Sequence, residues 1–165
     1  MTRFGHVMLL AAAWAVALVL AAPPAAAQGN DSASKPTVTA IAHKTHHLIL
    51  QVNTNDPAMM NLALNNATNV EQYYKARGEK VEIAVVTFGP GLNMLRDDTS
   101  PVKDRIKAIM ANSSFISFLA CGNTQEIMGK AEHKEIPLIS QATLVKDGVV
   151  RVMELQEQGW TYVRP

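Results

Sequence analysis

The chain has 165 residues, of which 48% are hydrophobic, 18% charged and 5% aromatic. The average soluble domain is about 25% charged, so this sequence is unusually apolar for its length. Without its first 27 residues it would have 138, the size of one ordinary domain. One of the 15 basic residues, Arg3, precedes position 28, so the remainder carries 14 basic and 14 acidic residues. This neutral balance excludes a nucleic-acid footprint, an acidic tail and a disordered chain.

Residues 1–27 have the pattern of a cleaved secretory signal peptide. An apolar run at positions 7–22 ends at Pro23 and Pro24, and three alanines, the small residues that a signal peptidase accepts, precede Gln28. An uncleaved membrane anchor is the alternative, but it needs about 20 apolar residues, and the run has 16. We therefore expect a periplasmic mature chain that has no membrane contact after cleavage.

Residues 28–45 show no hydrophobic period and predict a flexible N-terminal segment. Strand and helix patterns then alternate through residues 46–165, which predicts one domain. The expected strands are His47–Val52, Val81–Phe88, Phe115–Cys121, Thr143–Val145 and Trp160–Val163. The expected helices begin at Asp56–Pro57, at Ser100–Pro101, at Asn123 with Glu126 as a capping box, and at Gly148, where Val149, Val152, Met153 and Gln156 share one side.

Strands that alternate with helices predict a doubly wound α/β domain with a mostly parallel sheet and helices on both faces. Ligands of such sheets bind beyond the carboxyl ends of the strands. Three segments follow consecutive strands there: Asn53–Asp56, Gly89–Met94 and Cys121–Thr124. We expect them to meet at one edge of the sheet.

Cys121 is the only cysteine in the sequence, so no disulfide within the chain can form. It ends a buried strand, and Gly122 and the predicted helix start at Asn123 follow it directly. Amide donors and the helix dipole favour a thiolate at such a position, which is typical of a reactive cysteine. The alternative is a buried and inert side chain, because free cysteine is among the most buried residue types. Position alone leaves both interpretations open.

The loop Gly89–Met94 lacks the features of a phosphate-binding loop. The pattern G-x-G-x-x-G requires a third glycine where Met94 stands, and Pro90 offers no amide donor. We interpret the loop as a stiff turn that lets backbone approach the sulfur.

His43, His46 and His47 form the motif H-x-x-H-H ahead of the first strand. Imidazole is the commonest metal ligand, so a metal site is one hypothesis. Neighbouring residues of a strand point to opposite faces, however, and no cysteine or acidic residue nearby in the sequence completes a ligand set. Polar surface or capping contacts are the favoured interpretation, with no metal.

Several segments resemble the DsrE/DsrF-like family of small sulfur-relay proteins, from about His46 to Pro165. The segments are H-x-x-L-Q-V followed by N-D-P-A, the helix N-L-A-L-N-N-A, the loop F-G-P-G-L-N-M-L, the step F-L-A-C-G-N-T and the C-terminal Q-G-W-T-Y-V-R-P. The resemblance implies a flavodoxin-like three-layer sandwich that assembles into homo-oligomers. In sulfur-trafficking members, the cysteine that matches Cys121 accepts a sulfane sulfur as a persulfide and passes it on. Characterised members act in the cytoplasm, whereas this chain has the sequence pattern of an exported protein.

The sequence therefore predicts an exported sulfur-handling protein, sulfurtransferase-like if it has an activity at all, in which Cys121 is the persulfide carrier. Its partner would be a sulfane-sulfur donor or acceptor protein or a small thiol, and we expect no cofactor and no nucleic-acid partner. The residues expected around the sulfur are Asn53, Asn55, Gly89, Gly91, Asn93, Gly122, Asn123 and Thr124. The alternative is a non-catalytic module that binds a small ligand or anion, with Cys121 buried and inert.

Overall fold

The computed structural model describes residues 44–165. The predicted leader, His43 and nearly all of the predicted flexible segment 28–45 lie outside the described residues; Thr45, the last residue of that segment, already belongs to the first strand. The elements in chain order are β1 Thr45–Val52, α1 Pro57–Ala76, β2 Lys80–Thr87, the 3-10 helix η1 Gly89–Leu95, α2 Lys103–Asn112, β3 Ile116–Cys121, α3 Gly122–Glu132, β4 Ala142–Val145, α4 Gly148–Glu157 and β5 Thr161–Val163. In this part of the chain, no helix has the length and hydropathy needed to span a membrane.

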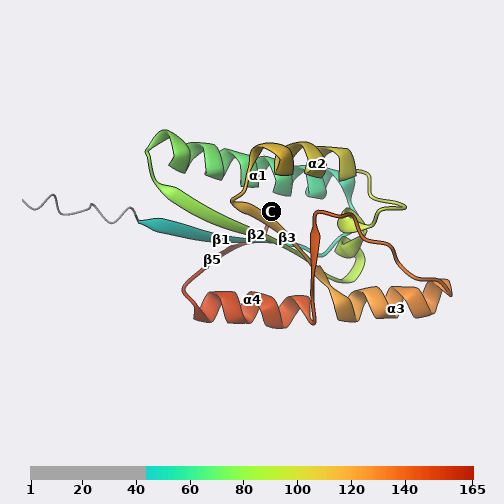
Figure 1. Ribbon diagram of the computed structural model, residues 1–165. Helices are drawn as coiled ribbons and strands as arrows, with labels where there is room; N and C mark the ends of the chain where they lie inside the picture. Colours follow the sequence, from blue (N-terminus) through green and yellow to red (C-terminus); the bar gives the residue numbers. More distant parts are fainter. Residues whose placement is uncertain (1–43) are drawn as a thin grey trace, which may run out of the picture. The chain divides into compact units, whose positions relative to one another are not determined.

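The five strands form one sheet in the order β4-β3-β2-β1-β5, and every neighbouring pair is parallel. Helices α1 and α2 lie on one face of the sheet and α4 on the other, with α3 continuing from the end of β3 (Figure 1). The predicted α/β class, a flavodoxin-like three-layer sandwich with a five-stranded sheet, is confirmed. Its sheet is parallel throughout.

Successive side chains of the central strands point to opposite faces of the sheet, and each face has its own hydrophobic core. In β2, Ile83 and Val85 pack under α1 and α2, whereas Ala84 and Val86 pack on the face that α4 covers. All four side chains are at most 2% exposed. A strand buried on both faces reads as a continuous apolar run, which is why Val81–Phe88 was recognisable in the sequence.

The start of α1 follows the predicted chemistry. Asp56 is the N-cap, its carboxylate accepts a hydrogen bond of 2.8 Å from the amide of Ala58, and Pro57 occupies the first turn. Met60, Leu64 and Ala67, which are spaced four and three residues apart and so share one face of the helix, are fully buried.

The predicted capping box at Asn123 and Glu126 is wrong. Helix α3 begins at Gly122, so the preceding residue, Cys121, is its N-cap. The strand passes into the helix without a loop, which moves the cap position two residues towards the N-terminus, from Asn123 to Cys121. The capping atom of α3 is therefore the sulfur of Cys121.

Two other helix predictions need correction. Helix α2 begins at Lys103 instead of Ser100–Pro101, because the Ser100 hydroxyl accepts a hydrogen bond of 3.3 Å from the Val102 amide and holds a turn ahead of the helix.

The buried side of α4 differs in part from the predicted one. Among the residues predicted to share one side, Val152 is buried but Val149 and Met153 are at least half exposed. The buried residues of α4 are Gly148, Val152 and Leu155. Gly148 packs against Phe88, which follows β2, and against Cys121 at the end of β3, so this side of the helix faces the sheet.

Candidate functional site

The carboxyl ends of the strands lie at one edge of the sheet, as expected. Val52 pairs with Thr87, Thr87 with Ala120, and Cys121 with Val145. The segments that follow β1, β2, β3 and β4 therefore start from the same edge. The predicted site residues come from the first three of these segments.

Cys121 joins the end of β3 to the start of α3. Its backbone is extended, with φ −72° and ψ 113°, and its sulfur accepts a hydrogen bond of 3.5 Å from the amide of Thr124. The free amides of a first helical turn carry partial positive charge. One of them, the amide of Thr124, is thus aimed at the sulfur.

The start of α4 covers Cys121, which is 3% exposed. A Cβ atom at Gly148 would lie 3.1 Å from the side chain of Phe88 and 3.2 Å from the Cβ of Cys121. The amide of Asn123 donates a hydrogen bond of 3.1 Å to the carbonyl of Lys146, which fixes the turn between β4 and α4 beside the cysteine. Cys121 is therefore almost closed to solvent.

Two further predicted residues lie beside Cys121. The amide of Gly89 donates a hydrogen bond of 3.0 Å to the hydroxyl of Thr124, which ties the end of β2 to the first turn of α3. Gly122 packs against β4, and a Cβ there would lie 3.2 Å from the carbonyl of Val145. Cys121, Gly122, Thr124 and Gly89 thus form one contiguous group.

The predicted asparagines form a second group. The side-chain amide of Asn93 donates a hydrogen bond of 2.7 Å to the side-chain oxygen Oδ1 of Asn55. The hydroxyl of Thr99, which the sequence did not single out, donates to the side chain of Asn93. These polar groups satisfy one another, so they hold η1 against the β1–α1 loop instead of lining the sulfur.

The Gly89–Met94 segment, predicted as a stiff turn, lies within the 3-10 helix η1. Its close backbone approach is made to β1: a Cβ at Gly91 would lie 2.2 Å from the carbonyl oxygen of Val52 and 2.8 Å from the Cα of Asn53. The expectation that this approach would be to the sulfur is not met: the Gly89 amide contacts the hydroxyl of Thr124 in the first turn of α3. Gly91 and Asn53 instead lock η1 onto the end of β1.

A groove of about 820 Å³ lies beside this site, between α3, β4 and α4. Asn123 is the one predicted site residue among those that line it, and Cys121 is not among them. Its remaining wall is mixed apolar and charged, formed by Leu119, Glu126, Thr143, Val145, Lys146, Asp147, Val150, Arg151 and Glu154. Lys146 and Asp147 belong to the same β4–α4 turn that lies beside the cysteine.

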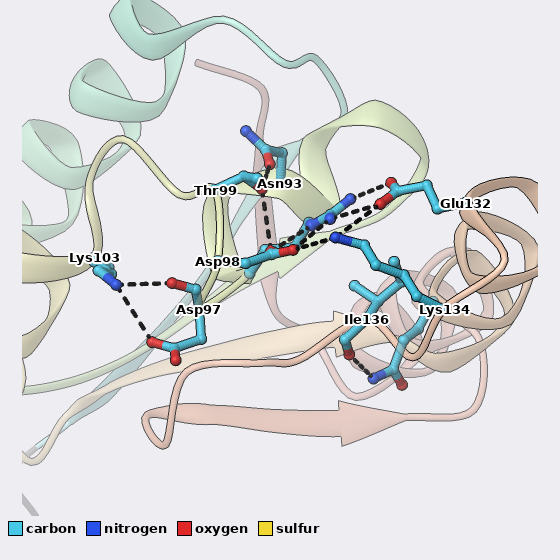
Figure 2. A network of polar contacts seen from close by, with 10 residues as sticks. Asn93, Asp97, Asp98, Thr99, Lys103, Glu132, Lys134 and Ile136 are labelled. Carbon is cyan, nitrogen blue, oxygen red and sulfur yellow. Dashed lines mark hydrogen bonds and ion pairs between the residues drawn. The ribbon is translucent and has the colours of Figure 1, made fainter.

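A charged network holds the other end of α3, and Figure 2 shows it from close by. Arg96, 5% exposed, donates from Nε and Nη2 to the two carboxylate oxygens of Asp98 at 2.9 and 2.8 Å, and it also pairs with both oxygens of Glu132. Lys134 lies 2.8 Å from Asp98 and 3.4 Å from Glu132. Helix α3 is therefore fixed at its start by the cysteine cap and near its end by Arg96.

The same network shifts the pKa values of its charged side chains. The bidentate hydrogen bonds from Arg96, and then that from Lys134, hold the pKa of Asp98 well below its usual range. Arg96 likewise lowers the pKa of Glu132. In return the hydrogen bonds to Asp98 and Glu132 raise the pKa of the Arg96 guanidinium, so it stays charged although it is buried.

His46 and His47 point to opposite faces of β1 and bind different partners. The Nε2 atom of His46 lies 2.6 Å from Glu79, and that of His47 lies 3.8 Å from Glu82. Between residues 44 and 165 no three His, Cys, Asp or Glu side chains are grouped as metal ligands. His43, the third histidine of the motif, lies outside the described residues.

Sequence reasoning missed the Arg96 network and the covering role of Gly148. Arg96 and Asp98 are two residues apart, a spacing that gives a weak sign of an ion pair, but Glu132 joins them from 36 positions away. Gly148 was recognisable as a helix start, and the contact that it makes with Cys121 depends on the tertiary packing.

Comparisons with known proteins give a fold relative but no family. The chain matches no protein-family model and no curated protein. It is similar to a solved structure described as the protein of unknown function MTH1491 from Methanobacterium thermoautotrophicum, with a TM-score of 0.61 and 26% sequence identity. The match covers 73% of this chain and 99% of the other. The chain therefore shares its α/β architecture with a protein that has no assigned activity.

Proposed function

We propose that Cys121 accepts a sulfane sulfur and carries it as a persulfide, and that the protein handles sulfur in the manner of the DsrE/DsrF-like family. The observation that carries this proposal is the hydrogen bond from the Thr124 amide to the Cys121 sulfur at the start of α3. A persulfide is more acidic than a thiol, and its anion gains from the same amide and helix dipole. The neighbouring hydrogen bond between Gly89 and Thr124 keeps this turn in place.

The proposed step transfers one sulfur atom from thiosulfate to the Cys121 thiolate and needs no external oxidant. The Cys121 thiolate attacks the outer sulfur of thiosulfate, a new sulfur–sulfur bond forms, and the bond inside thiosulfate breaks. Sulfite leaves with the electron pair, and the cysteine keeps the transferred sulfur as a persulfide anion. A thiol acceptor then attacks the outer sulfur and restores the Cys121 thiolate.

Export to the periplasm, assembly into homo-oligomers and exchange with a donor protein or a small thiol belong to the same proposal. Export is supported by the leader pattern of residues 1–27, and the other two by the motif resemblance. If the leader is cleaved as proposed, the protein isolated from its own compartment begins at Gln28, which N-terminal sequencing measures.

Persulfide formation tests the proposal through the intact mass of the protein after incubation with thiosulfate. We expect the wild-type chain to gain the mass of one sulfur atom and to lose it on reduction with dithiothreitol. Cys121→Ser keeps an oxygen at the cap position but should gain nothing. Ser117→Ala, a change in the same strand, is the matched control and should gain sulfur like the wild type. Full gain in Cys121→Ser would overturn the proposal.

A non-catalytic binding module is the second candidate, and one observation favours it. Cys121 is 3% exposed, and the neighbouring groove of about 820 Å³ is lined by other residues. In that case the groove would bind a small ligand or anion while the thiol stays inert. Iodoacetamide separates the two: a carrier is labelled in the folded protein at neutral pH, and an inert thiol is labelled only after unfolding in urea.

A further inference from the structure

Five side chains close a ring of contacts near the amino end of β1, far along the strands from Cys121. Arg77 donates to Glu79 at 2.8 Å, and the other carboxylate oxygen of Glu79 lies 2.6 Å from Nε2 of His46. His46 stacks on Tyr74 with 3.8 Å between ring centroids, and Tyr74 meets the edge of Tyr73 at 5.2 Å. The guanidinium of Arg77 lies 5.5 Å from the centre of Tyr73, which closes the ring.

This ring holds the aromatic side chains in place before any ligand arrives. Each member contacts two others, so none can change rotamer without breaking two contacts. The hydrogen bond from His46, and then that from Arg77, lowers the pKa of Glu79, which keeps its carboxylate charged between them at neutral pH. Tyr73 is nevertheless 59% exposed. A fixed and exposed aromatic surface binds with little loss of side-chain entropy.

A cavity of about 360 Å³ adjoins the ring. Leu48, Val70 and Val81 give it an apolar lining from β1, α1 and β2. Flat faces are added by His46, His47, Tyr73 and Tyr74. Asn69 on α1 and Thr161 on β5 add an amide and a hydroxyl group. An apolar cavity with a few polar groups is the usual form of a small-molecule site, and this volume lies near the lower end of the range of about 300–1,000 Å³.

We propose that this cavity binds a small planar aromatic molecule of one or two fused rings that carries a polar group at its edge. The flat faces of Tyr73, Tyr74 and His46 favour a planar ring over a bulky aliphatic group, because offset and edge contacts between rings add to the burial of apolar area. Asn69 and Thr161 can each donate and accept, so they suit a hydroxyl or carbonyl at the edge of the ring.

This site is independent of the sulfur proposal. His46 and Val81 stand near the amino ends of β1 and β2, whereas Cys121 is the last residue of β3. Ligand binding here therefore requires no chemistry at the cysteine. A failure at either site leaves the other proposal standing.

Two probes with one skeleton test the proposal: 2-naphthol, which is planar, and decahydro-2-naphthol, which is not. Both are uncharged at neutral pH and carry one hydroxyl group. Each is titrated into the full chain while the backbone amides are followed by NMR. We expect 2-naphthol to bind with a Kd on the order of 1 mM or lower, with shifts at Leu48, Asn69 and Val81 and none at Cys121 or Thr124. The saturated probe should bind at least tenfold more weakly.

Matched variants place the binding in this cavity. Tyr73→Ala removes an exposed wall and should weaken 2-naphthol binding at least tenfold. Gln72→Ala alters the neighbouring exposed residue of α1, which does not line the cavity, and should bind like the wild type. Equal affinity for the two probes, unchanged affinity in Tyr73→Ala, or no shift at the cavity residues up to the solubility limit of 2-naphthol would each overturn the proposal.

Discussion

The backbone amide of Thr124 donates to the sulfur of Cys121 across 3.5 Å, so the single cysteine of the chain caps the helix that follows it. Caps are normally supplied by the oxygens of Ser, Thr, Asp or Asn, which accept the otherwise unpaired amides of the first turn. The Cys121 sulfur thus has two roles: it stabilises the start of α3, and it is the atom to which the sulfur chemistry is assigned in our proposal. Both can be measured on the same variants.

The cap predicts an order of stability among substitutions at Cys121. Cys121→Ala removes the acceptor and should lower the free energy of unfolding by about 1 kcal/mol. Cys121→Ser keeps an acceptor for the Thr124 amide and should be more stable than the alanine variant. Urea denaturation monitored by circular dichroism measures both. An alanine variant as stable as the serine variant would show that the contact with sulfur contributes nothing to folding.

The close approach of η1 to β1 predicts that two nearby glycines tolerate substitution very differently. A Cβ at Gly91 would lie 2.2 Å from the Val52 carbonyl oxygen, so Gly91→Ala should cost about 3 kcal/mol or more through overpacking against backbone. At Gly89 there is open space where a Cβ would lie but a φ of +51°, so Gly89→Ala should cost about 1–2 kcal/mol. Equal losses in urea denaturation would contradict this account of the segment.

The buried guanidinium of Arg96 predicts a large effect from a substitution that keeps its bulk. Arg96→Met retains an unbranched chain but removes the hydrogen bonds to Asp98 and Glu132, and should cost roughly 2 kcal/mol of unfolding free energy. Lys103, whose ion pair with Asp97 at 3.6 Å is exposed, gives the control. Lys103→Met should change stability by no more than about 0.5 kcal/mol. Similar effects of the two variants in urea would contradict a special role for Arg96.

The lowered pKa values of Asp98 and Glu132 predict how stability responds to acid. The folded state binds protons at these carboxylates less readily than the unfolded chain, whose groups have ordinary values of 3.8 and 4.5. Their stabilising contribution is therefore present above those values and is lost as the pH falls through the lower folded ones. Urea denaturation as a function of pH should show stability falling below about pH 5. The fall should be shallower in Arg96→Met, and an identical pH profile in the two proteins would contradict the assignment.

Local chemistry made most of the fold predictable. The buried runs of β2 and β3 and the cap Asp56–Pro57 are local signals, and the structure confirms them. The start of α3 was misplaced because a strand that passes directly into a helix leaves no loop for a side-chain cap, and cysteine is not an expected cap. The buried side of α4 was partly wrong because Gly148 packs against Phe88 and Cys121, and no period in the helix sequence reports that contact.

The candidate site was predictable in its position but not in its connections. Parallel strands necessarily bring their carboxyl ends to one edge, so Cys121, Gly89 and Thr124 could be placed together from the sequence. Asn55 and Asn93 were expected at the sulfur, yet they bind each other and Thr99. Hydrogen-bond partners between polar side chains depend on distances of a few tenths of an ångström, which the strand pattern does not determine.

Cyanolysis of the sulfur-treated protein tests the central proposal most directly. Cyanide removes the outer sulfur of a persulfide as thiocyanate and leaves the cysteine thiolate, so the thiocyanate released per chain counts carried sulfur. After incubation with thiosulfate and removal of the excess, we predict close to one thiocyanate per wild-type chain, since the chain has one cysteine, and none from Cys121→Ser. No thiocyanate from the folded wild-type protein, or equal amounts from both proteins, would contradict a role for Cys121 as a sulfur carrier.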